Sequence, residues 1–331
     1  GAEEGRSRRA ERLRQPPQNT NPAPAGFVVL GANGLIVTAM PELPEVETVR
    51  RGLEPHLQGA KLSQVRLHRP NLRYPFPERF AERLEGAEVL RLERRAKYLL
   101  FYLDTQDIWV THLGMTGRFQ VNDSPEDLAR YYHAPKKQSA PDEKHLHFQC
   151  LATLPNGEVS RIDYYDPRRF GFMLLLKPDE LYESNWFKGL GIEPLSGELT
   201  ADVLLKMTKG RNVNLKALLM AQGGIAGLGN IYVCEALWRA RLSPDHKAAD
   251  LKPKAAQALV EGIRTVLEEA VASGGSSISD FAAASGELGY FQHRFCVYDR
   301  KGQPCRRDDG GIIERKVHQG RSSFYCPVCQ K

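Results

Sequence analysis

Apolar residues follow two different periods along this chain. In residues 42–58 they recur at three- and four-residue spacing, which predicts an amphipathic helix. Short apolar runs follow, separated by turn formers such as Pro155-Asn156-Gly157. These runs predict strands at residues 61–68, 87–94, 98–103, 108–112, 146–154, 159–165 and 172–176. The first half is therefore expected to be an antiparallel β domain with one helix at its start.

The second half of the chain has a helical period. Four helices are predicted, around Leu204, Leu218, Val233 and Ile263. The Gly-rich segment 223–229 precedes the third helix. Such a loop can present backbone N–H groups to a phosphate, although a plain helix–helix turn is at least as consistent with it. Residues 177–198 contain several Pro and Gly residues and are interpreted as a linker, whereas the polar residues 124–144 predict a long loop.

The composition is that of a globular protein. The chain has 331 residues, a length that suits two domains, and its net charge of +6 only weakly favours a polyanionic partner. It has no apolar run near the length of a membrane span, so no membrane association is expected. Four of the six cysteines fall late in the chain, which favours a metal site with buried thiols over a disulfide framework. We therefore expect a bacterial cytoplasmic protein.

The segment Met40-Pro41-Glu42-Leu43-Pro44-Glu45-Val46-Glu47-Thr48 combines an amine with a carboxylate. If the chain is cleaved after Met40, Pro41 carries a free secondary amine beside Glu42. An α-amino group has a pKa near ~8 and suits imine formation, and the neighbouring acid can shuttle protons. An ordinary helix start uses the same residues and is an equal alternative. Residues 1–39 are interpreted as a leader, a tag or a start assigned too far upstream. While they remain attached, the Pro41 nitrogen is an unreactive amide.

This segment resembles the amino terminus of formamidopyrimidine-DNA glycosylases, which are bacterial enzymes that remove oxidised purines from DNA. Five further blocks of the sequence resemble the same family and occur in order: Lys97-Tyr98-Leu99, His112-Leu113-Gly114-Met115-Thr116-Gly117, Asp166-Pro167-Arg168-Arg169-Phe170-Gly171, Gly227-Leu228-Gly229-Asn230-Ile231-Tyr232 and Gly320-Arg321-Ser322-Ser323-Phe324-Tyr325-Cys326-Pro327. Six blocks in order are far more specific than any one of them.

The resemblance implies an α+β fold in four parts after the leader. An N-terminal antiparallel β-sandwich with a flanking helix is expected over residues 40–176, and the linker over 177–198. A helix-two-turn-helix DNA-binding domain with a lid loop is expected over residues 199–290. Residues 291–331 would form a β-hairpin zinc finger. The partner implied is double-stranded DNA with an oxidised base, bound by a monomer near the nucleoid.

The resemblance also implies the roles of the catalytic residues. Pro41 would attack the sugar carbon C1′ and form a Schiff base, while Glu42 would transfer protons. Elimination of both flanking phosphates (β,δ-elimination) would then cut the strand. Lys97, Asn230 and Arg321 match residues that contact DNA phosphates in this family.

Further matches concern the base that is flipped out of the duplex. Glu45, Lys216 and Ser277 match positions that surround the base, with Ser277 in the flexible segment 273–281, which could also be a simple linker. Met115, Arg168 and Phe170 match the residues that fill the space left in the DNA stack. Core packing is the alternative for Met115 and Phe170, although a Pro-Arg-Arg-Phe-Gly loop is an unusual place for a core residue.

One structural zinc is expected from the resemblance, but the ligand set departs from the four cysteines of the family. Cys326 and Cys329 form an intact C-x-x-C pair, and Cys305 supplies a third thiolate. Because a carboxylate can serve as a zinc ligand, Asp308 is the first choice for the fourth ligand. The alternatives are Cys296, Asp309 and His318, or a hairpin that holds no metal.

Two further functions remain open at this point. A non-catalytic protein that binds damaged DNA is one of them, because an attached leader blocks the Pro41 nitrogen. An oxidised-pyrimidine glycosylase of the endonuclease VIII type is the second. That type usually has Gly where this chain has Leu43, which favours the oxidised-purine enzyme.

Overall fold

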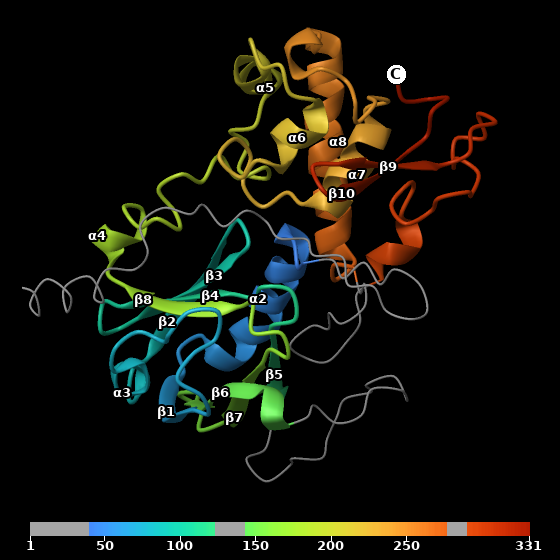
Figure 1. Ribbon diagram of the computed structural model, residues 1–331. Coiled ribbons are helices and arrows are strands. Elements are labelled where there is room, and N and C mark those ends of the chain that lie inside the picture. The colour runs from blue at the N-terminus through green and yellow to red at the C-terminus, as the bar shows by residue number, and fades with distance from the viewer. Residues whose placement is uncertain (1–39, 123–142, 277–289) are drawn as a thin grey trace, which may run out of the picture. The chain divides into compact units, whose positions relative to one another are not determined.

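The computed structural model describes residues 40–122, 143–276 and 290–331 (Figure 1). The predicted leader, Ser277 and most of the predicted loop 124–144 lie outside these residues. Within the described part, no helix combines the length and apolar character needed to cross a membrane.

The first helix is α2 (Leu43–Leu57), one residue shorter at each end than predicted. The backbone N–H of Glu42 donates to Glu45 Oε2 at 3.0 Å, which closes the helix start, and Pro44 occupies the first turn. The apolar face that includes Val49 and Leu53 is fully buried against the β domain. The helix start is therefore fixed by local sequence, and its orientation by burial.

Two four-stranded antiparallel sheets form the β domain. The first sheet has the order β1-β6-β7-β5, with β1 (Lys61–Leu67), β6 (Leu146–Thr153), β7 (Val159–Tyr165) and β5 (Arg118–Asn122). The second has the order β2-β3-β4-β8, with β2 (Val89–Arg95), β3 (Tyr98–Leu103), β4 (Ile108–His112) and β8 (Phe172–Leu176). All seven predicted strands are confirmed.

Aromatic side chains from both sheets meet in the core of the β domain. The rings of Phe101 and Trp109, from the second sheet, stack at 4.2 Å between centroids. Trp109 also contacts Phe148 and Phe119, from the first sheet, at 5.0 and 6.1 Å. The sheets therefore pack face to face as a sandwich, as expected. Helix α3 (Phe80–Leu84) and strand β5 were not predicted, because each has five residues with few apolar side chains and shows no clear period.

The segment predicted as a linker is ordered and packs against the β domain. It includes helix α4 (Pro178–Leu181), and the buried side chains of Leu181 and Phe187 contact Leu100 and Val110 of the second sheet. Further along, Ile192 pairs with Ile225 in a parallel bridge. These residues therefore join the two halves of the chain through contacts with both.

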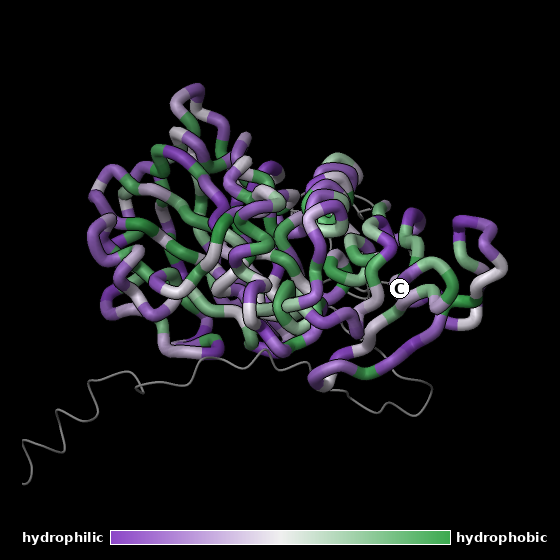
Figure 2. Tube along the Cα trace, turned by 90° about the horizontal axis from the view of Figure 1, so that it is seen from above, coloured by the Kyte–Doolittle hydropathy of each residue, from purple (hydrophilic) through white to green (hydrophobic). Residues whose placement is uncertain are grey.

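The C-terminal half is helical and ends in a β-hairpin. Its elements are α5 (Ala201–Thr208), α6 (Leu215–Met220), α7 (Asn230–Arg239), α8 (Pro253–Ala272), the 3-10 turns η2 (Ala248–Asp250) and η3 (Phe291–Arg294), and the strands β9 (Glu314–His318) and β10 (Arg321–Tyr325); a further 3-10 turn, η1 (Glu143–His145), belongs to the β domain. The apolar stripe predicted around Ile263 is the buried face of α8. Hydrophobic stretches gather toward the interior and hydrophilic ones occupy the outer turns (Figure 2).

Candidate active site and metal centre

The carboxylate of Glu42 lies at the N-terminus of helix α7. Its oxygens accept hydrogen bonds from the backbone N–H groups of Ile231 at 3.0 Å and Tyr232 at 3.5 Å. A helix N-terminus attracts negative charge because its first N–H groups lack partners within the helix. Gly229 makes this approach possible, since a Cβ atom there would overlap the Glu42 carboxylate. The Gly-rich loop before α7 therefore leaves room for the Glu42 side chain.

Burial controls the proton affinity of Glu42 and its basic neighbour. Glu42 is 3% exposed, and this burial raises its pKa to about 7, although Lys97 and the α7 N–H groups act in the opposite direction. Burial also lowers the pKa of Lys97, which the charge of Glu42 only partly offsets. Removal from water therefore outweighs the attraction between the two groups. A carboxyl with this pKa can both give and take a proton near neutral pH.

Glu45 is buried next to Glu42 but is more completely hydrogen-bonded. It accepts from the Tyr232 hydroxyl at 2.5 Å, from the Ser276 N–H and hydroxyl at 2.8 Å each, and from the Glu42 N–H at 3.0 Å. Burial raises the pKa of Glu45, and these donors oppose the rise. Ser276 is the last described residue before the segment that contains Ser277. Glu45 therefore anchors the base of the predicted lid loop.

Pro41 directly precedes Glu42 and is buried. The start of α2 is attached to the Gly-rich loop, because Leu43 N donates to Gly227 O at 3.2 Å. Gly227 has a φ of +96°, and a Cβ atom there would come within 2.8 Å of the Leu43 side chain. The amine candidate and the acid candidate are therefore held at the junction of the β and helical halves.

The three predicted phosphate contacts come together around this junction. Lys97 and Arg321 each interact electrostatically with Glu42 and with one another. Asn230 is the first residue of α7, and its Nδ2 atom donates to Ser322 O at 2.9 Å, next to Arg321. Burial lowers the pKa of Arg321, while the charge of Glu42 raises it. Three segments far apart in sequence thus supply the positive and amide groups of one site.

Lys216 contacts the hairpin strand from within the helical half. Its side chain is buried, and Nζ donates to Ser322 O at 2.7 Å and to Ser323 Oγ at 2.5 Å. In this position Lys216 supports the strand that begins with Arg321. Its implied role near the flipped base stays a prediction.

Met115, Arg168 and Phe170 lie on two loops that are tied together. Thr116 Oγ1 donates to Asp166 Oδ1 at 2.6 Å and accepts from Arg168 N at 3.2 Å. The Arg168 guanidinium lies over the Phe170 ring, 4.8 Å from its centroid. Met115, Arg168 and Phe170 are all half-buried. Their loops thus offer a thioether, a cation and an aromatic ring for the predicted contact with the DNA stack.

Four side chains near the C-terminus form a metal-binding geometry. The ligand atoms of Cys305, Asp309, Cys326 and Cys329 all lie within 4.8 Å of one another. Cys305 Sγ is 3.9 Å from Cys329 Sγ, and Cys326 Sγ is 3.6 Å from Asp309 Oδ2. Tetrahedral zinc separates two sulfurs by ~3.8 Å and a sulfur and an oxygen by ~3.5 Å. The residues therefore fit a structural zinc.

The choice of Asp308 as fourth ligand is corrected by this geometry. Asp308 has a φ of +53°, and its N–H donates to Cys305 O at 3.2 Å. This left-handed turn carries the following residue, Asp309, toward the thiols, so the ligand comes four positions after Cys305. Cys296 and His318 also lie outside the group of four ligands: Cys296 Sγ is 3.6 Å from Arg294 O, and His318 contacts Ser323 and Asp245.

Two groups beside the thiols were not anticipated. Arg307 Nη1 donates to Cys329 Sγ at 3.2 Å and to Trp238 O at 2.8 Å, and its guanidinium stacks 3.9 Å from the Trp238 ring centroid. The indole of Trp238 donates to Cys305 Sγ at 3.5 Å. These contacts bind the cysteine cluster to the C-terminal end of α7. The adjacent Cys305-Arg306-Arg307 sequence was the only available signal, and an Arg in a basic run usually faces solvent.

Known proteins resemble this chain over most of its length. A family model of the formamidopyrimidine-DNA glycosylase N-terminal domain matches residues 40–173, and one of the H2TH domain of the same enzymes matches residues 190–282. A formamidopyrimidine-DNA glycosylase of Caulobacter sp. (strain K31) is 52% identical over 297 residues, covering 88% of this chain and 100% of the relative. The enzyme of Brucella canis is 49% identical over 296 residues, covering 88% and 100%.

Solved structures give the same result. The MutM (Fpg) protein of Thermus thermophilus is 37% identical with a TM-score of 0.72, covering 88% of this chain and 98% of that one. Lactococcus lactis Fpg, solved in complex with DNA containing an abasic site, is 31% identical with a TM-score of 0.74, covering 88% and 100%.

Proposed function

The chain belongs to the formamidopyrimidine-DNA glycosylase family, and we propose that it excises oxidised purines from double-stranded DNA and then cuts the strand. The substrates would be 8-oxoguanine and formamidopyrimidines. The observation that carries the proposal is the buried Glu42, which has a pKa of about 7 and lies next to Pro41.

The first step joins Pro41 to the sugar. A free Pro41 nitrogen donates its electron pair to C1′, the glycosidic bond breaks toward the base, and the base takes up a proton. Glu42 in its protonated form supplies a proton to O4′ as the sugar ring opens, which leaves an iminium ion. Its carboxylate form can then assist removal of the C2′ proton, and the 3′ phosphate departs. A second elimination releases the 5′ phosphate, and water frees Pro41.

The groups around Glu42 would hold the DNA. Lys97, Asn230 and Arg321 contact the phosphates next to the lesion, which positions the backbone without reading sequence. Flipping a nucleotide costs a few kcal/mol, and Met115, Arg168 and Phe170 fill the vacated stack. Glu45 would lie beside the flipped base. The three sets lie on separate segments, so each can be tested by itself.

Cys305, Asp309, Cys326 and Cys329 would hold one zinc ion. When bound, a structural zinc stabilises the fold of a small hairpin that has too few residues for a hydrophobic core of its own. The hairpin strand β10 begins with Arg321, so the four ligands hold a phosphate contact in place. Arg307 donates to Cys329 and offsets part of the negative charge of the thiolates.

Borohydride trapping tests the proposed chemistry. A chain that begins at Pro41 is mixed with a duplex containing 8-oxoguanine opposite C, and borohydride reduces the iminium to a stable protein–DNA adduct. We expect the adduct with this chain and none with a chain proven by mass spectrometry to retain residues 1–39. An adduct with the leader intact would show that another amine is the nucleophile. Binding without any adduct would favour the non-catalytic alternative.

A strand-cleavage assay with the chain that begins at Pro41 separates the two lesion classes. A duplex with thymine glycol opposite A serves as the matched substrate for an oxidised-pyrimidine enzyme. We expect faster strand cleavage of the 8-oxoguanine duplex under single-turnover conditions. The reverse preference would assign the chain to the endonuclease VIII type of activity.

A further inference from the structure

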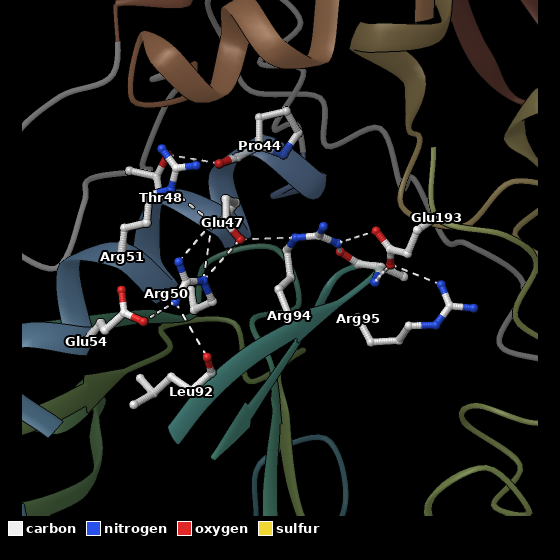
Figure 3. Close-up of polar contacts among 11 residues, drawn as sticks. Pro44, Glu47, Thr48, Arg50, Arg51, Glu54, Leu92, Arg94, Arg95 and Glu193 are labelled. Atoms are coloured by element: carbon white, nitrogen blue, oxygen red, sulfur yellow. Dashed lines mark hydrogen bonds and ion pairs between the residues drawn. The ribbon is translucent and has the colours of Figure 1, made fainter. Parts of the chain in front are cut away.

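Glu193 forms a contact network outside the groups assigned above. It lies in the segment 177–198, and its Oε1 atom accepts a hydrogen bond from Ala96 N at 2.5 Å. Its carboxylate also pairs with Arg94 Nη1 at 2.9 Å and Arg95 Nη1 at 3.0 Å (Figure 3). The Glu193 side chain is 19% exposed and that of Arg94 11%, so solvent screens these pairs only in part. One carboxylate therefore binds three consecutive residues of strand β2 and its turn.

The turn that Glu193 binds is the one that presents Lys97. Arg95 pairs with Tyr98, so Ala96 and Lys97 form the two-residue connection between β2 and β3. Ala96 has a φ of +53°, a left-handed conformation that a non-glycine residue adopts only when its surroundings determine it. Glu193 accepts its N–H, and Arg94 Nη1 donates to its carbonyl at 2.9 Å. Both polar groups of the strained residue are thus held by this network.

Glu193 is itself fixed against the loop that enters α7. The preceding residue, Ile192, donates its N–H to Gly224 O at 3.1 Å and accepts from Ala226 N at 2.9 Å. On the other side, Arg94 Nε pairs with Glu47 Oε2 of helix α2 at 3.3 Å (Figure 3). The carboxylate therefore connects the turn of Lys97 with the segments that carry Asn230 and Glu42.

We propose that Glu193 is a positioning residue for Lys97. The proposal rests on the proposed function, because it assigns to Lys97 the phosphate contact described there. In Glu193→Gln the amide keeps one acceptor oxygen but turns an NH2 group toward the donor of Arg94 or toward those of Arg95 and Ala96. Arg94 keeps its pair with Glu47 and Arg95 its bond to Gly191 O, but the shared negative charge that holds the turn is lost. The Lys97 ammonium would then be displaced from the phosphate. The sheet itself would keep its structure, because β3 remains paired with β4.

A double-mutant cycle on the full protein tests this action through Lys97. Single-turnover excision from the 8-oxoguanine duplex is measured for four proteins: the wild type, Glu193→Gln, Lys97→Met and the double variant. The effect of Glu193→Gln is then compared with and without the Lys97 side chain. We expect a loss of about tenfold with Lys97 and under about twofold with Lys97→Met, because coupled residues are not additive. Glu183→Gln, in the same segment but exposed and paired with Lys188, is the matched control and should leave the rate unchanged. Equal losses in both backgrounds would overturn the proposal.

A binding measurement gives a readout that needs no chemistry. The affinity for a duplex with a tetrahydrofuran abasic analogue is followed against salt concentration. Loss of one phosphate contact lowers the slope of log K against log salt by about 0.9, and we expect the same single decrease in Glu193→Gln, Lys97→Met and the double variant. A lower melting temperature of Glu193→Gln with an unchanged slope would reduce Glu193 to a stabilising residue and refute the proposal. If the slopes change as expected but the wild-type chain gives no borohydride adduct, the catalytic proposal fails and the positioning role stands.

Discussion

Helix α7 has a polar cluster at each end, and the two clusters differ in how they are satisfied. At the N-terminal end, Glu42 and Glu45 receive hydrogen bonds from Ile231, Tyr232 and Ser276. At the C-terminal end, three thiols and the Asp309 carboxylate gather, and the Arg307 guanidinium contacts one of the thiols. In the first cluster, donors of the protein itself supply hydrogen bonds to the carboxylates. The second cluster gathers ligand atoms suited to a bound cation.

The difference shows what each cluster can do. The Glu42 carboxyl is buried, and its pKa is raised to about 7. A group with this pKa is suited to proton transfer near neutral pH. Thiols whose pKa is raised by burial, as for Cys305, do not ionise without a cation at neutral pH. We therefore expect substitutions at the N-terminal end to affect chemistry, and those at the C-terminal end to affect assembly of the hairpin.

The largest expected effect comes from removing the titrating group at the N-terminal end. Glu42→Gln keeps the shape and the acceptor for Ile231 N but cannot transfer a proton. Single-turnover excision should fall by at least ~100-fold, the usual contribution of a general acid. Glu54→Gln, on the exposed side of the same helix, is the control and should change the rate less than about twofold. A Glu42→Gln rate near that of the wild type would remove Glu42 from the mechanism.

Zinc affinity should distinguish Asp309 from the neighbouring Asp308 in the cluster at the C-terminal end of α7. Asp309→Ala removes one of four ligands and should lower zinc affinity at least ~10-fold, measured by competition with a chromogenic chelator. Asp308→Ala is the matched control and should bind as the wild type does. If Asp308→Ala loses the metal and Asp309→Ala keeps it, the assignment drawn from the turn geometry is wrong.

The pH dependence of stability offers a sharper test of the N-terminal cluster. The pKa of Glu42 rises from 4.5 to about 7 on folding, so the folded state binds the proton more tightly. The stability that this supplies is complete below pH 4.5 and is lost as the pH rises through about 7. Glu42→Gln avoids this loss, so its free energy of unfolding relative to wild type should increase between about pH 5 and about pH 8 by up to ~3 kcal/mol. Chemical denaturation at both values measures it, and a constant difference would contradict the burial argument.

The last prediction concerns the close approach of Glu42 to α7. A Cβ atom at Gly229 would overlap the Glu42 carboxylate, so Gly229→Ala should destabilise the fold by about 2 kcal/mol. Gly189→Ala is the control, because nothing lies within 4 Å of its Cβ position and its φ is not positive. Urea denaturation compares the two. Equal stability of both variants would mean that Glu42 does not lie against Gly229.

Local sequence was sufficient for most of the elements. The seven predicted strands and the helix from residue 43 were found because their periodicity and turn formers act over a few residues. Strand β5 escaped because its five residues contain only two apolar side chains, Phe119 and Val121, too few to show an apolar run. The motif that contains Glu42 also pointed to an acid, yet its pKa could not be inferred, since burial depends on how α2 and α7 pack.

The sequence by itself determined the family resemblance, the order of the elements and the residue types available for chemistry, because these depend on short motifs and local periods. Only the tertiary structure decided that Asp309 and not Asp308 joins the thiols, since one left-handed residue reverses which side chain turns inward. The same holds for Glu193, an ordinary glutamate before Pro194, which gains its place at the Lys97 turn through contacts with residues nearly a hundred positions distant. Side-chain contacts of this range are set by packing, and no local pattern encodes them.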